Sequence, residues 1–382
     1  MGLRDAVVVG GGPAGLAFAA DAAARGLEVV VLEKREGPLD KACGEGVLPA
    51  GRRALERLGA LALVAPGAAA PIEELRWCDR GHELCVRLPG GGGVGIRRTA
   101  LSAALRARAA AAGAELRAGA EVVEHRRERD RIVAVLADGA EVAARVLVAA
   151  DGLASPVRRR EGLDLPARGP ARFGVRRHFA IEPWSRAVEV HFGPGVEAYL
   201  TPVGPARVGL AFLFAQERRS GEGPLALSGG RHRRPESKGE RFEELLSFFP
   251  ALQRRLDGAR PDTAVLGAGP LARRARARVA DRLVLLGDAA GYLDAVTGEG
   301  ISLALGSAQD LAAILPGALA RGADAAALAG YERAWRRRYR TYAAWTRLML
   351  LLTRHPALRR GVLGLAGAQR PAFERIVAAA VG

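Results

Sequence analysis

A glycine-rich turn near the start of the chain has the residue types and spacing needed to hold phosphate groups. Its pattern is GxGxxG, with the glycines at Gly10, Gly12 and Gly15. In such a turn the first glycine permits a tight bend, the second lets the backbone approach a pyrophosphate, and the third lets a helix pack closely on a strand. The candidate phosphate-binding residues are Gly10, Gly12, Pro13, Ala14 and Gly15.

The segments around this turn predict a strand–helix–strand unit. Residues 5–10 are an apolar run typical of a buried strand, Ala14–Arg25 is an alanine-rich helix, and Glu28–Leu32 is a second apolar strand. Glu33 ends that strand, where a carboxylate accepts hydrogen bonds from ribose hydroxyls. Lys34 follows it and joins the cofactor-binding candidates. The sequence therefore predicts a Rossmann-type dinucleotide site.

Two later motifs each place an aspartate after an apolar strand. Asp151 lies in Val148–Gly152 (VAADG), and Asp288 lies in Leu285–Ala290 (LLGDAA). Either motif alone is an ordinary strand-terminating turn, but the order of all three is specific. The second continues into a helix start that adds Gly298, Gly300 and Ile301 to the candidates.

With these motifs in order, the chain resembles the FAD-dependent family that includes the para-hydroxybenzoate hydroxylase-type monooxygenases and the geranylgeranyl reductases, over about residues 5–310. The resemblance implies FAD as cofactor, with Glu33 at the adenosine ribose and Asp288 at the ribityl chain. It implies a role for Asp151 near both FAD and NAD(P)H, the probable electron donor. Arg98, in the pattern RxxLxxxL, matches the family arginine near the cofactor, although an arginine that merely begins a helix has the same appearance.

Beyond the first unit, the strand pattern changes along the chain. Residues 172–214 alternate apolar and polar positions in the manner of antiparallel strands, and α/β patterning then returns. This predicts an α/β fold: a Rossmann-type FAD-binding domain with an inserted antiparallel β-sheet substrate domain and a C-terminal helical segment. The predicted ranges are 1–75, 97–165 and 265–310 for the FAD-binding domain, 76–96 and 166–264 for the substrate domain, and 311–382 for the helical segment. Helices are also predicted at 52–64 and 242–256, and a mobile polar loop at 217–240.

The choice between oxygen chemistry and reduction depends on a few segments. Residues 41–46 (KACGEG) are similar to a segment of the geranylgeranyl reductase branch, and residues 290–294 (AGYLD) lack the His and Pro of the hydroxylase relatives. Residues 197–202 (EAYLTP), however, keep little of the prenyl reductase signature YxWxFP. Because the match to the prenyl reductase signature is this weak, we favour a monooxygenase that hydroxylates or epoxidises an apolar small molecule with NAD(P)H and oxygen. The alternatives are a flavin-dependent reductase of a prenyl or other alkene, and a non-catalytic flavin-binding module.

No protein side chain is identified as catalytic by these patterns, because the flavin itself carries the chemistry. Cys43 is a candidate for contact with the flavin ring, and the alternative is a small residue that packs in a loop.

Composition excludes several other classes. The net charge is +16 and all but three of the 57 basic residues are arginine, but they are spread along the chain without interleaved aromatics, so we expect no nucleic-acid partner. The three cysteines, Cys43, Cys78 and Cys85, have no CxxC spacing, which argues against a disulfide framework or a metal site. We therefore expect the protein to be located in the reducing cytoplasm. No apolar run is long enough to predict a membrane span.

The C-terminal segment 331–352 places Trp335, Tyr339, Tyr342, Trp345 and Leu348 on one helical face, with arginines elsewhere. Such a helix makes peripheral membrane contact or packs its aromatic face on the rest of the fold. We favour the second interpretation.

Overall fold

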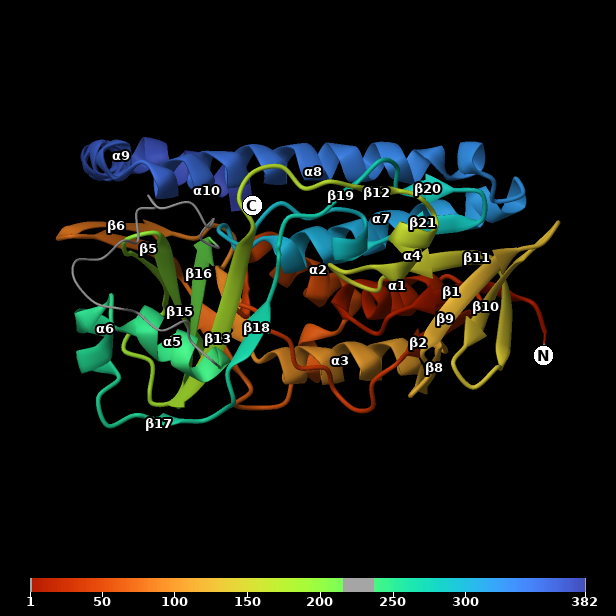
Figure 1. Ribbon diagram of the computed structural model, residues 1–382, viewed down its shortest axis with the longest axis horizontal. Coiled ribbons are helices and arrows are strands. Elements are labelled where there is room, and N and C mark those ends of the chain that lie inside the picture. The colour runs from red at the N-terminus through yellow and green to blue at the C-terminus, as the bar shows by residue number, and fades with distance from the viewer. Residues whose placement is uncertain (1, 216–236, 382) are drawn as a thin grey trace.

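The computed structural model describes residues 2–215 and 237–381, and its strands form two large sheets with helices packed over them (Figure 1). The first sheet has a parallel centre in the spatial order β21-β11-β1-β2-β8. Its parallel strands are β1 (Arg4–Val9), β2 (Val29–Glu33), β8 (Glu115–Ala118), β11 (Glu141–Ala149) and β21 (Leu283–Leu285). Antiparallel strands β9 (Val122–Arg127), β10 (Ile132–Leu136) and β20 (Val279–Ala280) extend it.

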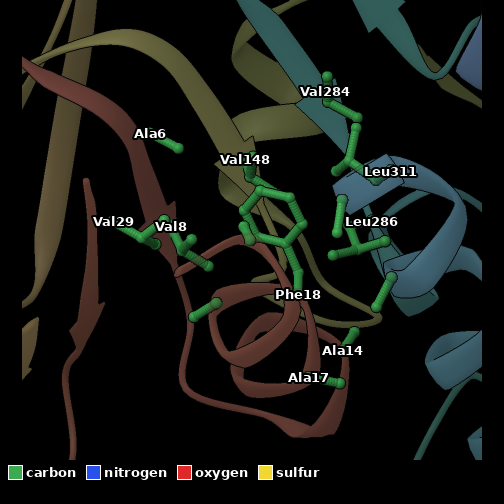
Figure 2. Packing of buried hydrophobic residues seen from close by; sticks show 14 of the residues in the cluster. Ala6, Val8, Ala14, Ala17, Phe18, Val29, Val148, Val284, Leu286 and Leu311 are labelled. Atoms are coloured by element: carbon green, nitrogen blue, oxygen red, sulfur yellow. The ribbon is translucent and has the colours of Figure 1, made fainter. Parts of the chain in front are cut away.

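The central strands are buried on both faces, which is why they read as continuous valine-rich runs. Helices α1 (Pro13–Ala24), α3 (Arg98–Ala111) and α7 (Gly300–Ala320) pack on them. Figure 2 shows Phe18 of α1 directed at Val148 of β11, with Leu286 and Leu311 beside it. Because β1, β2, β11 and β21 are parallel, the segments that follow them meet at one edge of the sheet.

By length and composition, α7 is the one helix among the described residues that is apolar enough to cross a membrane. It packs against α1 and α8, and Leu305, Leu311 and Leu315 are buried. Its apolar composition is therefore that of a core helix.

The second sheet has the order β17-β13-β16-β15-β14-β5-β6. Its strands are β5 (Glu74–Asp79), β6 (His82–Arg87), β13 (Arg172–Ala180), β14 (Ala187–Phe192), β15 (Val196–Gly204), β16 (Arg207–Ala215), β17 (Arg260–Pro261) and β18 (Leu266–Ala268). All pairs are antiparallel except β5–β14. Both β5 and β18 pair within this sheet, although β5 begins before the predicted range 76–96 and β18 lies wholly beyond the predicted range 166–264.

Smaller elements join the two sheets. They are β3 (Gly46–Val47), β4 (Ala69–Ile72), β7 (Gly93–Ile96), β12 (Asp164–Leu165), β19 (Arg274–Ala275), α2 (Pro49–Leu58), α4 (Pro156–Arg160), α5 (Lys238–Leu246), α6 (Pro250–Arg255) and the 3-10 turns η1 (Leu61–Leu63) and η2 (Gly287–Ala289). The three strands β3, β7 and β4 form their own sheet between the two large ones.

Two helix predictions were wrong at their ends. The helix expected over 52–64 stops at Leu58, because Gly59 adopts the left-handed conformation (φ 76°) that terminates helices. The helix expected over 242–256 is two helices, because Pro250 begins a new one. Most of the predicted loop 217–240 lies outside the described residues.

Three C-terminal helices complete the fold: α8 (Ala325–Arg354), α9 (Pro356–Ala368) and α10 (Arg370–Val381). In Figure 1, α8 runs along both sheets. Tyr331, Trp335 and Tyr342 are buried, so the aromatic face is structural as predicted. Leu348 is the exception, since it is 44% exposed. The parallel sheet, the separate antiparallel sheet and these helices confirm the predicted fold class.

Candidate cofactor and substrate site

One elongated cavity of about 720 Å³ extends from the glycine-rich turn to the second sheet. The strand ends of the parallel sheet form one end of it. The predicted cofactor residues that line it are Gly10, Gly12, Pro13, Ala14, Glu33, Lys34, Arg98, Asp151, Asp288, Gly298, Gly300 and Ile301. Gly15 does not line it.

The three motif glycines meet different surroundings. A Cβ on Gly10 would lie 2.5 Å from the Ala150 carbonyl oxygen, and one on Gly15 would lie 2.2 Å from the Gly10 oxygen. These two glycines are therefore required by packing, and Gly10 also has φ of +107°. A Cβ on Gly12 would meet no protein atom within 4 Å, because it would project into the cavity. This open cradle at a helix N-terminus fits a pyrophosphate.

Glu33 is buried, and its carboxylate accepts hydrogen bonds from two backbone N–H groups. Its Oε2 accepts a hydrogen bond from the Gly11 N–H at 2.7 Å, and its Oε1 accepts one from the Arg35 N–H at 3.0 Å. The carboxylate thus ties the glycine turn to the end of β2. Each oxygen has a further lone pair, which leaves acceptor capacity for a ribose hydroxyl.

Asp151 has a spare acceptor in the cavity wall. Its Oδ2 accepts a hydrogen bond from the Val157 N–H at 3.1 Å, but its buried Oδ1 has no partner among the described residues. Burial raises the pKa of this carboxyl. Because buried polar atoms are nearly always paired, the free oxygen fits a hydroxyl or amide donor supplied by a bound ligand.

Lys41 is a cationic group in the cavity that the motifs did not identify. Burial lowers its pKa, while the nearby charge of Asp288 opposes that shift. The composition could have pointed to Lys41, because an arginine-rich chain with three lysines keeps lysine at few positions. Those lysines are Lys34, Lys41 and Lys238, and all three line the cavity. Together with Arg98, Lys34 and Lys41 give the cofactor end the positive charge that a diphosphate requires.

The N-terminus of α7 faces the same cavity through Gly298 and Gly300. A helix of this length carries a partial positive charge at its start. Glu299, between the two glycines, is buried with its Oε2 unpaired among the described residues, and burial raises its pKa to about 8. Glu299 is therefore mostly neutral near pH 7 and does not cancel the helix charge.

A buried network holds the loop that carries Cys43. Glu45, which has φ of 59°, accepts a hydrogen bond from the Arg98 N–H at 2.7 Å and contacts His178 Nε2 with its other oxygen. Arg176, also on β13, donates to the Lys41 carbonyl at 2.8 Å. No sequence motif predicted this network, which holds the loop against the second sheet.

Cys43 lines the cavity, and burial raises the pKa of its thiol. The Glu45 N–H donates a weak hydrogen bond to its sulfur at 3.3 Å. The thiol is therefore protonated at neutral pH.

The far end of the cavity is apolar. It is lined by Leu75, Trp77, Val188, Val190, Tyr199, Leu213, Trp345 and Met349. The Tyr199 hydroxyl donates to the Val296 carbonyl at 3.0 Å, so it presents little free polarity. Phe179 and Phe212 instead pack with α5 and α6 on the other face of the sheet.

Comparisons with known proteins agree with this geometry. The family model described as "FAD binding domain" matches residues 4–346. Menaquinone reductase of Mycobacterium tuberculosis is 31% identical over 343 residues, covering 83% of this chain and 79% of the relative. Digeranylgeranylglycerophospholipid reductase of Methanoculleus marisnigri is 27% identical over 348 residues, covering 87% and 81%.

Solved structures share the fold at low identity. A flavin-dependent brominase superposes with a TM-score of 0.80 at 18% identity, covering 98% of this chain and 94% of that one. A flavoprotein/dehydrogenase from Cytophaga hutchinsonii gives 0.79 at 18% identity, covering 91% and 86%. Because the family model spans residues 4–346 and the relatives are similar over most of the chain, the chain belongs to the FAD binding domain family and is an FAD-dependent oxidoreductase.

Proposed function

We propose that this oxidoreductase reduces a carbon–carbon double bond in a prenyl or similarly apolar substrate. The observation that carries the proposal is the continuity of the cavity, which joins the cofactor end to an apolar end past a protonated thiol. The names of the relatives, menaquinone reductase and digeranylgeranylglycerophospholipid reductase, support reduction over oxygen insertion. This reverses the preference of the sequence analysis for a monooxygenase.

FAD bound in the cavity would, once reduced, supply a hydride to one carbon of the alkene, and the neighbouring carbon would need a proton. Cys43 carries such a proton on Sγ. The loop that carries Cys43 extends from the cofactor end to the substrate sheet. At one end the Lys41 side chain approaches Gly152, where an added Cβ would lie 3.0 Å from Nζ, and at the other end Gly46 lies against Val188. In this proposal the thiol donates its proton to the substrate, and the buried network through Glu45 fixes the thiol's position.

The apolar lining binds and orients the substrate. Trp77, Leu213 and Met349 offer surface without charge, which suits a branched hydrocarbon chain and excludes water from the reacting carbons. The α7 N-terminus, freed from an opposing charge by the neutral Glu299, favours the anionic state of the reduced cofactor.

The electron donor in this proposal is NAD(P)H. The chain has one GxGxxG turn in a strand-to-helix setting, so the donor would bind transiently at the cofactor domain rather than in a dinucleotide domain of its own.

The test is product analysis after turnover with prenyl quinones and isoprenoid alkenes. Reduction adds two hydrogens to the product, and in deuterated water the one that the thiol delivers as a proton arrives as deuterium. Addition of an oxygen atom instead would support the monooxygenase interpretation, and flavin without turnover on any substrate would support a binding module.

A further inference from the structure

The outer surface of the three C-terminal helices is unusually apolar. Five of the eight exposed large apolar side chains among the described residues lie there, namely Leu348, Leu351, Leu358, Leu365 and Ile376, and we call this set the C-terminal apolar face. Leu365 is 67% exposed, the highest value of the eight. Apart from Leu358 and Leu365, the exposed residues of α9 are Pro356, Ala357, Gly361, Gly364, Gly367 and Ala368. None of these exposed residues is charged.

The charge around this face has one sign. Residues 347–381 contain six arginines and one acidic residue, Glu374, which pairs with Arg370. Arg359 is buried against Asp79 and belongs to the fold. Arg347, Arg354 and Arg375 are exposed, and no described carboxylate forms a salt bridge with them. Arg347 and Arg354 flank the exposed Leu348 and Leu351 along α8, and Arg375 precedes the exposed Ile376 on α10. Exposed apolar residues interspersed with arginines are typical of a segment that lies on an anionic membrane.

The inner surfaces of the same helices form the wall of the apolar cavity. Trp345 and Met349 of α8 line it, and the exposed Leu348 and Leu351 lie in the same stretch of that helix. Phe373 of α10 packs edge-on against Trp77, another lining residue, with ring centroids 6.1 Å apart. Helices α8 and α10 therefore contribute both to the wall of this end of the cavity and to the exposed apolar residues.

We propose that the C-terminal apolar face docks on the surface of an anionic lipid bilayer. Lipid supplies both an apolar phase for the leucines and negative headgroups for the arginines. A second copy of this chain fits less well, because a symmetric interface would place the unpaired arginines of both copies together. Under the proposed function, docking here also brings an apolar substrate directly to the wall of the cavity.

The test is co-sedimentation of the full FAD-loaded chain with phosphatidylcholine vesicles, with and without phosphatidylglycerol. We expect binding to the anionic vesicles that weakens as salt is added. The double variant Leu358→Asp/Leu365→Asp should bind about tenfold more weakly or worse. Leu63→Asp is the matched control, since Leu63 is 46% exposed in η1 of the cofactor domain, and it should bind as the parent does. Retained flavin absorbance shows that each variant is folded.

Charge is tested separately with Arg347→Gln/Arg354→Gln, which should lose affinity for anionic vesicles only. Absence of vesicle binding by the parent, or equal binding by the leucine variant, would overturn the proposal. A parent that sediments as a dimer, ignores vesicles and becomes monomeric in the leucine variant would assign the face to self-association instead. No substrate is used, so failure here is distinct from failure of the reductase proposal.

Discussion

The backbone N–H of Arg98 donates a hydrogen bond to the Glu45 carboxylate across 2.7 Å. This contact joins the first residue of α3 to the loop that carries Cys43. The other oxygen of Glu45 meets His178 on β13, so one buried carboxylate connects the start of α3, the loop that carries Cys43 and the second sheet.

Gly12→Val should abolish FAD binding without unfolding the protein. The new side chain meets no protein atom within 4 Å but fills the space over the helix N-terminus. The measurement is fluorescence titration with FAD, beside a thermal melt of the apoprotein. Gly361→Val on α9 is equally open and should keep FAD, so equal FAD affinity in the two variants would argue against the pyrophosphate site.

Glu33→Ala should lower the free energy of unfolding of the apoprotein by about 1.5–3 kcal/mol, since a charged acceptor of two backbone N–H groups is lost. Denaturant unfolding measures it. Asp288→Ala should instead weaken FAD binding with less effect on apoprotein stability. If Glu33→Ala unfolds at the same denaturant concentration as the parent, Glu33 does not hold the glycine turn.

Stability should depend on pH through Glu299. Its folded pKa of about 8 lies above the ordinary value of 4.5, so the folded state holds a proton that the unfolded state releases. This stabilisation is complete below pH 4.5 and is lost as pH rises through 8. Relative to Glu299→Gln, the free energy of unfolding of the parent should fall by up to about 1.4 kcal/mol per pH unit between these two pH values. Parallel stability–pH curves for the two proteins would exclude a neutral Glu299.

Cys43→Ala should slow alkene reduction about a hundredfold or more, because general acids contribute rate factors of about that size. FAD binding should persist, since the thiol lines the cavity without a charge. Pre-steady-state reduction rates measure the effect. Cys78→Ala on β5 is the control, because Cys78 does not line the cavity, and it should react at the parent's rate. A parental rate in Cys43→Ala would remove the thiol from the mechanism.

The cofactor end could be predicted from sequence because its information is local. Arg4 to Glu33 form one contiguous strand–turn–helix–strand unit, and Asp151 and Asp288 each lie within three residues of the end of a strand. The parallel pairing of those strands then brings their ends together at one edge. The buried aromatic face of α8 was predictable for a similar reason, since helical periodicity is visible in a short window.

The thiol-loop network could not be predicted in this way. Glu45 and His178 are 133 positions apart, and each appears in sequence as an ordinary polar residue. Glu299 is similar: its raised pKa depends on burial created by the packing of α7, not on its neighbours in sequence. The C-terminal apolar face could be predicted only in part: helical periodicity placed Leu348 with the aromatic residues of α8, but which of its apolar residues the fold buries and which it exposes depends on tertiary packing.

Anaerobic single turnover tests the central claim most directly. The FAD-loaded protein is reduced chemically under argon and mixed with a quinone that carries an unsaturated prenyl chain, while flavin absorbance is followed. We predict that the oxidised flavin spectrum returns without oxygen and that the prenyl chain gains two hydrogens. A flavin that stays reduced until oxygen is admitted, with a product that has gained an oxygen atom, would contradict it.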